Sequence, residues 1–343
     1  MIKKILTAFL LLPTLLCAQI NTERVMTIAR NALYFEDYVL SIQYFNQVIN
    51  AKPYLYEPYF FRGLAKINLD DFQGAEADCN AAIQRNPFVV GAYQIRGLAR
   101  IRQNNYDGAI EDYKTALKYD PENLVLWHNL SLCHMQKEDY GAAKEDLGKL
   151  LKIAPRYTRA YLMRGEVSLK QKDTIQALND FEKAIEWLVS AGILNRIYNV
   201  SKMEHPLSAF DKLDQFKLFL FDTGLLKHMA GIDNSAILLK ADYQFKGPLT
   251  ENYVLQQFRG QFAVEPRYYS DKNGEIDFLL QHGMDIIPVE AKGGEEKSAP
   301  SFKRYIAERH PKYAIRFSKR GYRKDGAITN IPLYLVRKTR ELL

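Results

Sequence analysis

Two acidic residues and a lysine in the second half of the chain have the types and spacing of a divalent-cation site. Asp277 opens one apolar, strand-like run, and Glu290 and Lys292 lie on the next. If the turn between them centres on Gly283 and Met284, an antiparallel hairpin places residue 277 opposite residue 290. Residues 290 and 292 then share one face. Such carboxylates suit Mg²⁺ or Mn²⁺, which lowers the pKa of an attacking water in hydrolysis.

The same residues have a simpler interpretation. The pattern Glu-x-Lys is common, and a second instance follows at 295–297. Asp277, Glu290 and Lys292 could therefore form a surface ion-pair cluster without a metal. Spacing alone leaves both interpretations open.

A basic segment follows this constellation, and its charges are interleaved with aromatic residues. Residues 303–340 hold 12 Lys and Arg against two acidic residues. Such a stretch can contact phosphates and stack on bases, or it can be a solvated basic face over aromatic residues that pack on strands. The candidate nucleic-acid contacts are Lys303, Arg304, Arg316, Lys319, Arg320, Arg323 and Lys324.

Other cofactors are not expected. The six histidines show no H-E-x-x-H and the three cysteines no C-x-x-C, so zinc is not predicted. No G-x-x-x-x-G-K-[ST] occurs, and therefore no nucleotide binding or ATPase activity is predicted.

Composition and the N-terminus set the broad class of the protein. The 343 residues are 47% hydrophobic and 25% charged, which excludes a disordered chain, a collagen or a multi-spanning membrane protein. Residues 1–18 have a Lys pair, an apolar core and a small residue at a cleavage position, the pattern of a signal peptide. We expect export to the periplasm or outside the cell, and no stable membrane span after cleavage.

A period of 34 residues organises the first half. Four columns share it: Pro53, Pro87, Pro121 and Pro155; Ala75, Ala109, Ala143 and Ala177; Tyr59, Tyr93, Trp127 and Tyr161; and Gly63, Gly97, Ser131 and Gly165. In this register the repeats run 22–55, 56–89, 90–123, 124–157 and 158–191, and the first and last are atypical. The period and the order of the columns resemble the tetratricopeptide (TPR) repeat.

The TPR resemblance implies an all-α solenoid over 22–186, in which each unit is a pair of helices. It also implies a protein or peptide bound in the concave groove. Helical spacing selects groove candidates from the first helix of each pair, although any of them could instead pack repeat on repeat. They are Phe60, Leu64, Gln94, Leu98, His128, Leu132 and Leu162.

The repeat ends near Trp187, and the composition becomes that of an α/β domain. Strand-like runs are predicted at 219–221, 276–280, 286–289, 314–317 and 331–336, with helices at about 250–262 and 301–309. No Pro/Gly/Ser linker separates the two halves. Residues 187–343 are therefore predicted to be a second domain, which begins inside or just after a helix.

Several collinear motifs in this second domain carry a second resemblance. They are WLVSAGILNRIYNVSK, FKLFLFDTGLL, KGPLTENYVLQQF, EIDFLLQ, IIPVEAKGG, PKYAIRFSKRGY and NIPLYLV. The stretch resembles the C-terminal domain of unknown function that is attached to AAA-type ATPases, a family considered related to the PD-(D/E)XK, restriction-endonuclease-like fold. The resemblance implies a metal site of Glu251, Asp277 and Glu290, with Lys292 near the scissile phosphate. Glu251 could instead complement a helix dipole.

Two functional hypotheses follow. In the first, the protein is an interaction scaffold whose second domain is accessory and lacks its usual ATPase partner. In the second, it is a metal-dependent DNA endonuclease or DNA-binding protein that the repeats recruit to an assembly. The signal peptide favours the first hypothesis, whereas the acidic constellation and a cytoplasmic location typical of the second domain favour the second. The junction near 187 could also mark a recent fusion of unrelated halves.

Overall fold

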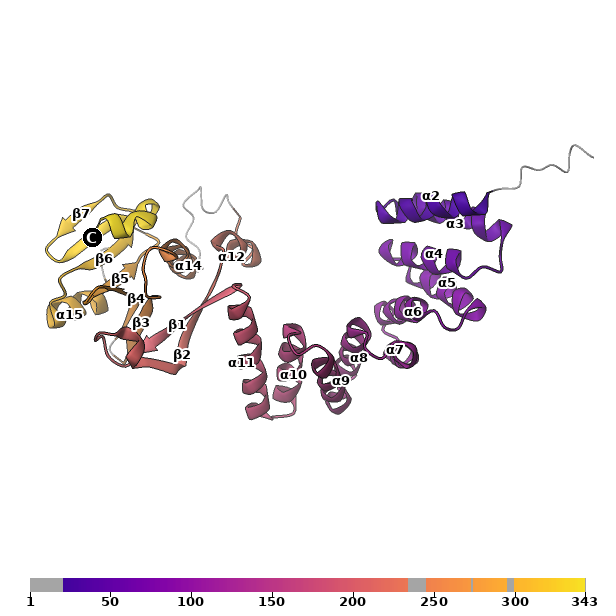
Figure 1. Cartoon of the computed structure of the whole chain (residues 1–343), viewed down its shortest axis with the longest axis horizontal. Coiled ribbons are helices and arrows are strands. Elements are labelled where there is room, and N and C mark those ends of the chain that lie inside the picture. Colours follow the sequence, from indigo (N-terminus) through magenta and orange to yellow (C-terminus); the bar gives the residue numbers. More distant parts are fainter. Residues whose placement is uncertain (1–20, 234–244, 273, 295–298, 343) are drawn as a thin grey trace, which may run out of the picture. The chain divides into compact units, whose positions relative to one another are not determined.

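The chain, described from a computed structural model, divides into two compact units, Met1–Ala184 and Ile185–Leu343 (Figure 1). The structure describes residues 21–233, 245–272, 274–294 and 299–342. The predicted signal peptide at 1–18 lies outside these residues. No helix in the described part of the chain is long and apolar enough to cross a membrane.

The first unit is a solenoid of five helix pairs, as the TPR register predicts. Each pair lies within one 34-residue repeat. The pairs are α2 (Thr22–Tyr34) with α3 (Tyr38–Ala51), α4 (Glu57–Asn68) with α5 (Phe72–Arg85), α6 (Val90–Arg102) with α7 (Tyr106–Tyr119), α8 (Leu124–Gln136) with α9 (Tyr140–Ile153), and α10 (Thr158–Lys170) with α11 (Thr174–Ser190).

The turn inside each pair repeats at atomic detail. Glu36, Asp70, Asn104, Glu138 and Lys172 all have φ between +58° and +63°, and they are 34 residues apart. The residue after each of the first four then caps the second helix, because its side chain accepts a hydrogen bond from a backbone N–H of the first turn. This left-handed residue and the cap together end one helix and start the next.

Small residues allow the two helices of a pair to approach closely. Ala75, Ala109 and Ala143 are fully buried. A Cβ on Gly97 would lie 2.7 Å from the ring of Tyr113, and a Cβ on Gly165 would lie 2.5 Å from the ring of Phe181. The Gly and Ala columns are therefore packing positions, and they carry no chemistry of their own.

The second unit is built on one mixed eight-stranded sheet. Its strands lie in the order β2-β1-β3-β4-β5-β6-β8-β7. They are β1 (Leu194–Val200), β2 (Asp211–Leu220), β3 (Arg267–Asp271), β4 (Gly274–His282), β5 (Asp285–Ala291), β6 (Ala314–Ser318), β7 (Arg323–Asp325) and β8 (Ile328–Pro332). The described helices are η2 (Leu207–Phe210), α12 (Thr223–Met229), α14 (Lys246–Phe258), α15 (Pro300–Arg309) and the 3₁₀ helix η3 (Leu333–Glu341).

Each face of this sheet has its own core. Phe278, Val289 and Phe317 pack with α14 and η3 on one face. Ile276, Leu279 and Ala314 pack with Phe302 of α15 on the other face (Figure 1). Alternation along the strands explains this division, because successive side chains point to opposite faces.

Two strand predictions need correction. The strand expected at 331–336 ends at Pro332, and η3 follows it, since a proline has no N–H to continue the ladder. The strand expected at 219–221 is the end of a longer strand, β2, that starts at Asp211. The observed boundaries of β6 and α15 lie within one residue of those predicted.

Candidate functional site

The acidic constellation forms around the hairpin of β4 and β5. Phe278 pairs with Val289 and His282 with Asp285, so that Asp277 stands opposite Glu290, in the register that the sequence predicts. Gly283 makes the turn with a φ of +60°. The Asp277 carboxylate accepts a hydrogen bond of 2.7 Å from the backbone N–H of Ala291. This bond ties the carboxylate to the partner strand.

Three carboxylates from two elements meet beside the hairpin. One carboxylate oxygen each of Glu251, Glu275 and Asp277 lies within 4.8 Å of the other two. Glu251 lies on α14, and Glu275 precedes Asp277 by two residues on β4, so both β4 side chains point to one side. We call these three residues the acidic cluster. The sequence-based prediction omitted Glu275, although its position two residues before Asp277 could have revealed it.

Glu290 and Lys292 form a pair next to this cluster. The Lys292 Nζ lies 2.6 Å from the Glu290 carboxylate, and the Glu290 side chain is only 6% exposed. Both charges act on Asp277: Glu290 raises its pKa and Lys292 lowers it. The predicted residues Asp277, Glu290 and Lys292 are thus neighbours, but Glu290 stands beside the three-carboxylate group.

Lys217 of β2 is a member of this site that the sequence-based prediction missed. Its Nζ lies 3.2 Å from the Glu251 carboxylate and also donates to Glu275. Burial lowers the pKa of Lys217, but Glu251 and Glu275 outweigh that effect, so the pKa is raised. Lys217 therefore stays charged and places a positive charge among the carboxylates.

The carboxylates nevertheless remain short of positive charge. Burial, followed by Glu290 and Glu251, raises the pKa of Asp277 to about 7. Burial also raises the pKa of Glu290, against the lowering effect of Lys292. Buried carboxylates that repel one another are stabilised by a cation. The oxygen donors of the acidic cluster fit Mg²⁺ or Mn²⁺ in type.

We predict that Asp277→Asn stabilises the metal-free second unit near pH 8 and leaves it unchanged near pH 4. The pKa of Asp277 is about 7 when folded, against an ordinary 3.8. The folded state therefore binds more protons between these values, and stability falls as pH rises toward 7. Asparagine keeps the acceptor for Ala291 without the charge, a gain on the order of 3 kcal/mol near pH 8. Urea unfolding at both pH values, with hydrogen exchange at 274–292, measures it; an Asn variant no more stable than wild type near pH 8 contradicts the prediction.

The predicted basic residues separate into groups. Four of the seven, Lys303, Arg316, Arg320 and Arg323, line a single hollow of about 530 Å³. Arg304 lines a different pocket, which also includes Tyr269 and Glu275. The remaining two, Lys319 and Lys324, are exposed and line neither of these pockets. The basic segment is thus divided by its own fold.

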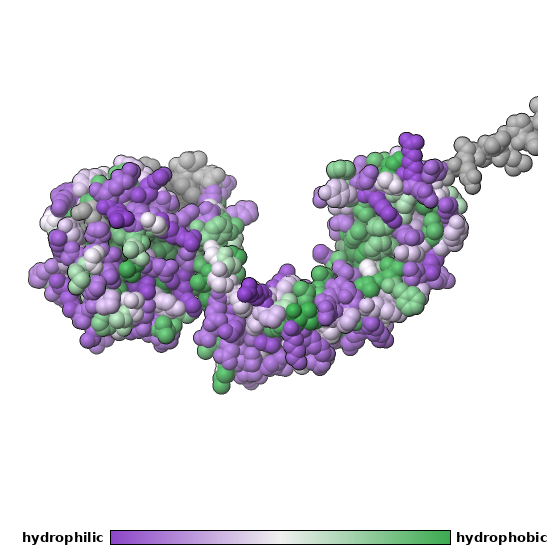
Figure 2. All heavy atoms as spheres, viewed as in Figure 1, coloured by the Kyte–Doolittle hydropathy of each residue, from purple (hydrophilic) through white to green (hydrophobic). Residues whose placement is uncertain are grey.

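The groove candidates of the solenoid also differ in their surroundings. Phe60 packs on the core between the second and third pairs, and Leu132 packs on the core of the fourth and fifth. His128 is buried, with its ring edge-on to Tyr157. Leu64, Gln94 and Leu98 are half-buried, whereas Leu162 is 39% exposed. Figure 2 shows apolar residues gathered over the first two helix pairs.

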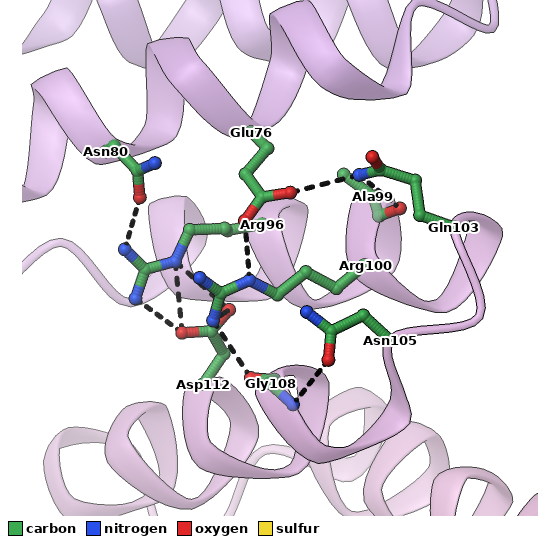
Figure 3. Close-up of polar contacts among 9 residues, drawn as sticks. All are labelled: Glu76, Asn80, Arg96, Ala99, Arg100, Gln103, Asn105, Gly108 and Asp112. Carbon is green, nitrogen blue, oxygen red and sulfur yellow. Dashed lines mark hydrogen bonds and ion pairs between the residues drawn. The ribbon is translucent and has the colours of Figure 1, made fainter.

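A network of buried ion pairs within the repeats escaped the sequence-based prediction. Arg96 donates to Asp112 at 3.1 Å and to Asn80 at 2.6 Å, and Arg100 bridges Asp112 and Glu76 (Figure 3). The same pairing recurs 34 residues away on each side of this network or at twice that spacing, in Arg62–Asp78 and Arg164–Asp180. These columns share the period of the Pro and Ala columns, which is the signal that could have found them.

The fourth repeat departs from this pattern. Leu130 stands where an arginine would be, and the Asp146 carboxylate lies 2.7 Å from Nδ1 of the buried His134 instead. Every one of these aspartates is therefore held by a cation or an imidazole from the first helix of its own pair.

Comparison with known proteins assigns both units. Family models for the tetratricopeptide repeat match residues 56–88 and 100–164. The model for a domain of unknown function, DUF4143, matches residues 246–336. The chain carries tetratricopeptide repeats and a DUF4143 domain. Glu251, Glu275, Asp277, Glu290 and Lys292 all lie within the DUF4143 match. No curated protein matches the chain in sequence.

Another domain of unknown function, DUF8612, matches residues 135–236. This match runs from α8 in the first unit through Lys217 of β2 in the second. A sequence pattern that continues across the junction recurs as a unit in other proteins. It therefore argues against an accidental fusion of unrelated halves. Lys217 reaches the carboxylates of the DUF4143 domain from outside the DUF4143 match.

Solved structures that resemble the chain cover about half of it. A MamA protein is 21% identical with a TM-score of 0.48, and covers 49% of this chain and 92% of its own. MamA from Desulfovibrio magneticus RS-1 is 18% identical with a TM-score of 0.47, and covers 49% and 96%. YrrB, described as a TPR protein with an unusual peptide-binding site, is 11% identical with a TM-score of 0.44, and covers 48% and 84%. Likeness at this level assigns no ligand to the chain.

Proposed function

We propose that the tetratricopeptide repeats make this protein an interaction scaffold that binds a protein or peptide partner. The observation that carries the proposal is the run of five helix pairs in TPR register, whose first helices leave apolar side chains such as Leu162 accessible. Stacked repeats form an extended surface, and peptides bind such surfaces through a few apolar anchors.

Two matched substitutions test this binding surface. Leu162 on α10 is 39% exposed and Ile153, at the end of the second helix α9, is 38% exposed. Peptides selected on the full-length protein from a random library are expected to bind Leu162→Glu at least about 10-fold more weakly, a loss of ~1.4 kcal/mol. Ile153→Glu is expected to bind as wild type in the same fluorescence-anisotropy titration. Equal affinity for Leu162→Glu and wild type would argue against a groove at α10.

We further propose that the second unit hydrolyses phosphodiester bonds in DNA, with a divalent cation held by Glu251, Asp277 and Glu290. Glu275 joins this set because its carboxylate lies with those of Glu251 and Asp277. When bound, Mg²⁺ or Mn²⁺ would polarise a phosphate and lower the pKa of a water. Lys292, held by Glu290, would stabilise negative charge on the phosphate.

The supporting observation is that buried carboxylates and a lysine gather from three elements on one hairpin. A surface ion-pair cluster would be exposed, but Asp277 and Glu290 are 8% and 5% exposed. The test is incubation of the full-length protein with labelled single-stranded, duplex and branched DNA. Separate reactions contain Mg²⁺, Mn²⁺ or EDTA, and products are resolved on denaturing gels. Absence of metal-dependent products on every substrate would leave the scaffold as the function.

We propose export as the location, on the basis of the signal-peptide pattern at 1–18. A cytoplasmic location is the alternative that the DNA-directed activity favours. Mass spectrometry of the N-terminus of the natural protein separates the two. An intact Met1 contradicts export.

A further inference from the structure

The hollow lined by Lys303, Arg316, Arg320 and Arg323, which we call the basic hollow, is connected to the acidic site by strand register. Glu290 of β5 is the register partner of Arg316 on β6, Arg316 is the partner of Asn330 on β8, and Asn330 is the partner of Arg323 on β7. Directly paired residues share one face of a sheet. A single row of side chains therefore runs from Glu290 across four strands to the far wall of the hollow.

The length of this row selects the kind of ligand. Neighbouring strands lie about 4.8 Å apart, so three steps carry the row about 14 Å from Glu290 to Arg323. A nucleic-acid strand carries one phosphate per ~3.4 Å of helix axis. The row thus spans several phosphates of one strand, whereas a single phosphate ion would occupy a fraction of it.

The floor of the basic hollow is built by a buried amide. Asn330 is 3% exposed, and its Oδ1 accepts hydrogen bonds from Ser318 Oγ at 2.8 Å and from Arg316 Nε at 3.3 Å. Its Nδ2 donates to the carbonyls of Arg320 and Gly321. One side chain therefore holds both the Arg316 guanidinium and the backbone of the loop that carries Arg320.

The chemistry of the lining favours nucleic acid over an acidic peptide. Three of the four cations are arginines, whose planar forks match pairs of phosphate oxygens. Asp325 also lines the hollow, so its formal charge is about +3. Tyr322, 53% exposed, adds an aromatic ring at the rim, and bases stack on such rings.

We propose that the basic hollow binds the phosphate backbone of a single nucleic-acid strand, which then runs along the row past Glu290 to the acidic cluster. The proposal rests on the phosphodiester hydrolysis proposed above, for which it names the substrate-binding surface. Base stacking on Tyr322 makes a single strand the preferred form over a duplex.

Binding in EDTA tests this surface separately from cleavage. Full-length wild type, Lys303→Ala/Arg320→Ala and Tyr322→Ala are titrated against a fluorescent oligonucleotide of about 16 nucleotides. Four phosphate contacts on a single strand give a slope of log K against log salt of about −2.8, and the double variant about −1.4. That difference is a roughly 25-fold loss of affinity at ~0.1 M salt. The Arg320 bonds that organise the loop are backbone bonds, so its truncation leaves the loop in place.

The matched control is Lys338→Ala/Arg340→Ala, which removes two charges from η3 on the other core of the same unit. It is expected to keep wild-type affinity. An unchanged salt slope in the Lys303/Arg320 variant overturns the proposal, as does an equal loss in the η3 control. Equal competition by polyglutamate and by oligonucleotide at matched charge also overturns it. Binding that depends on the hollow without any metal-dependent cleavage refutes the hydrolase and leaves the hollow standing.

Discussion

Asp277→Ala is expected to reduce metal-dependent cleavage of DNA by the full-length protein at least about 100-fold. Loss of groups that only orient metal ligands already costs 10–100-fold, and Asp277 is proposed to be a ligand itself. The alanine also frees the backbone N–H of Ala291, which now donates to the carboxylate. Initial rates of product formation at saturating Mn²⁺ measure the effect.

Companion variants separate chemistry from folding. Lys292→Ala is expected to cut the rate about as strongly while leaving metal affinity near the wild-type value, because its proposed role is charge stabilisation. Glu341→Gln removes an exposed carboxylate from η3 and is expected to cleave normally. Full activity of either Asp277→Ala or Lys292→Ala would show that the cleavage arises elsewhere or from a contaminant.

Asp112→Ala is expected to have the largest effect on the solenoid, a loss of about 3 kcal/mol in the free energy of unfolding. Asp112 is 2% exposed and balances both Arg96 and Arg100 (Figure 3). Without it the two guanidinium groups share only Glu76 and amide or carbonyl oxygens. Each is 16–18% exposed, so water replaces part of the lost interaction. Urea unfolding followed by far-UV circular dichroism measures the change.

Asp107→Ala provides the matched control on the same helix. Asp107 also pairs with a lysine, Lys137, but its side chain is 78% exposed. Exposed ion pairs contribute about 0–1 kcal/mol, so this variant is expected to unfold near the wild-type urea concentration. If both aspartate variants shift the midpoint equally, burial is not what gives the Asp112 network its importance.

The residues differ in how well the sequence could place them. Asp277 and Glu290 were placed opposite each other because a hairpin is local: a two-residue turn at Gly283 and Met284 fixes its register. Glu251 was placed by resemblance alone. Lys217 was missed because β2 lies 34 residues before Glu251 and 58 before Glu275 in the chain. Nothing local in its sequence indicates that sheet order β2-β1-β3-β4 will bring it to them.

The basic segment shows the same limit. Sequence proximity grouped Lys303 with Arg304, but adjacent residues of α15 point in different directions, and only Lys303 lines the basic hollow. Arg316, Arg320 and Arg323 join it because parallel pairing of β6 with β8 and the hydrogen bonds of Asn330 fold that part of the chain over one sheet face.

By itself, the sequence determined the five helix pairs, because a 34-residue period states the local geometry of every helix, turn and cap. It also determined the β4–β5 hairpin and the α/β character of the second unit. The tertiary structure decided which charges meet: Lys217 and Glu275 with Glu251 and Asp277, and four basic residues in one hollow. Helix and turn formation depends on neighbours along the chain, whereas the order of strands in a sheet depends on contacts between segments far apart in it.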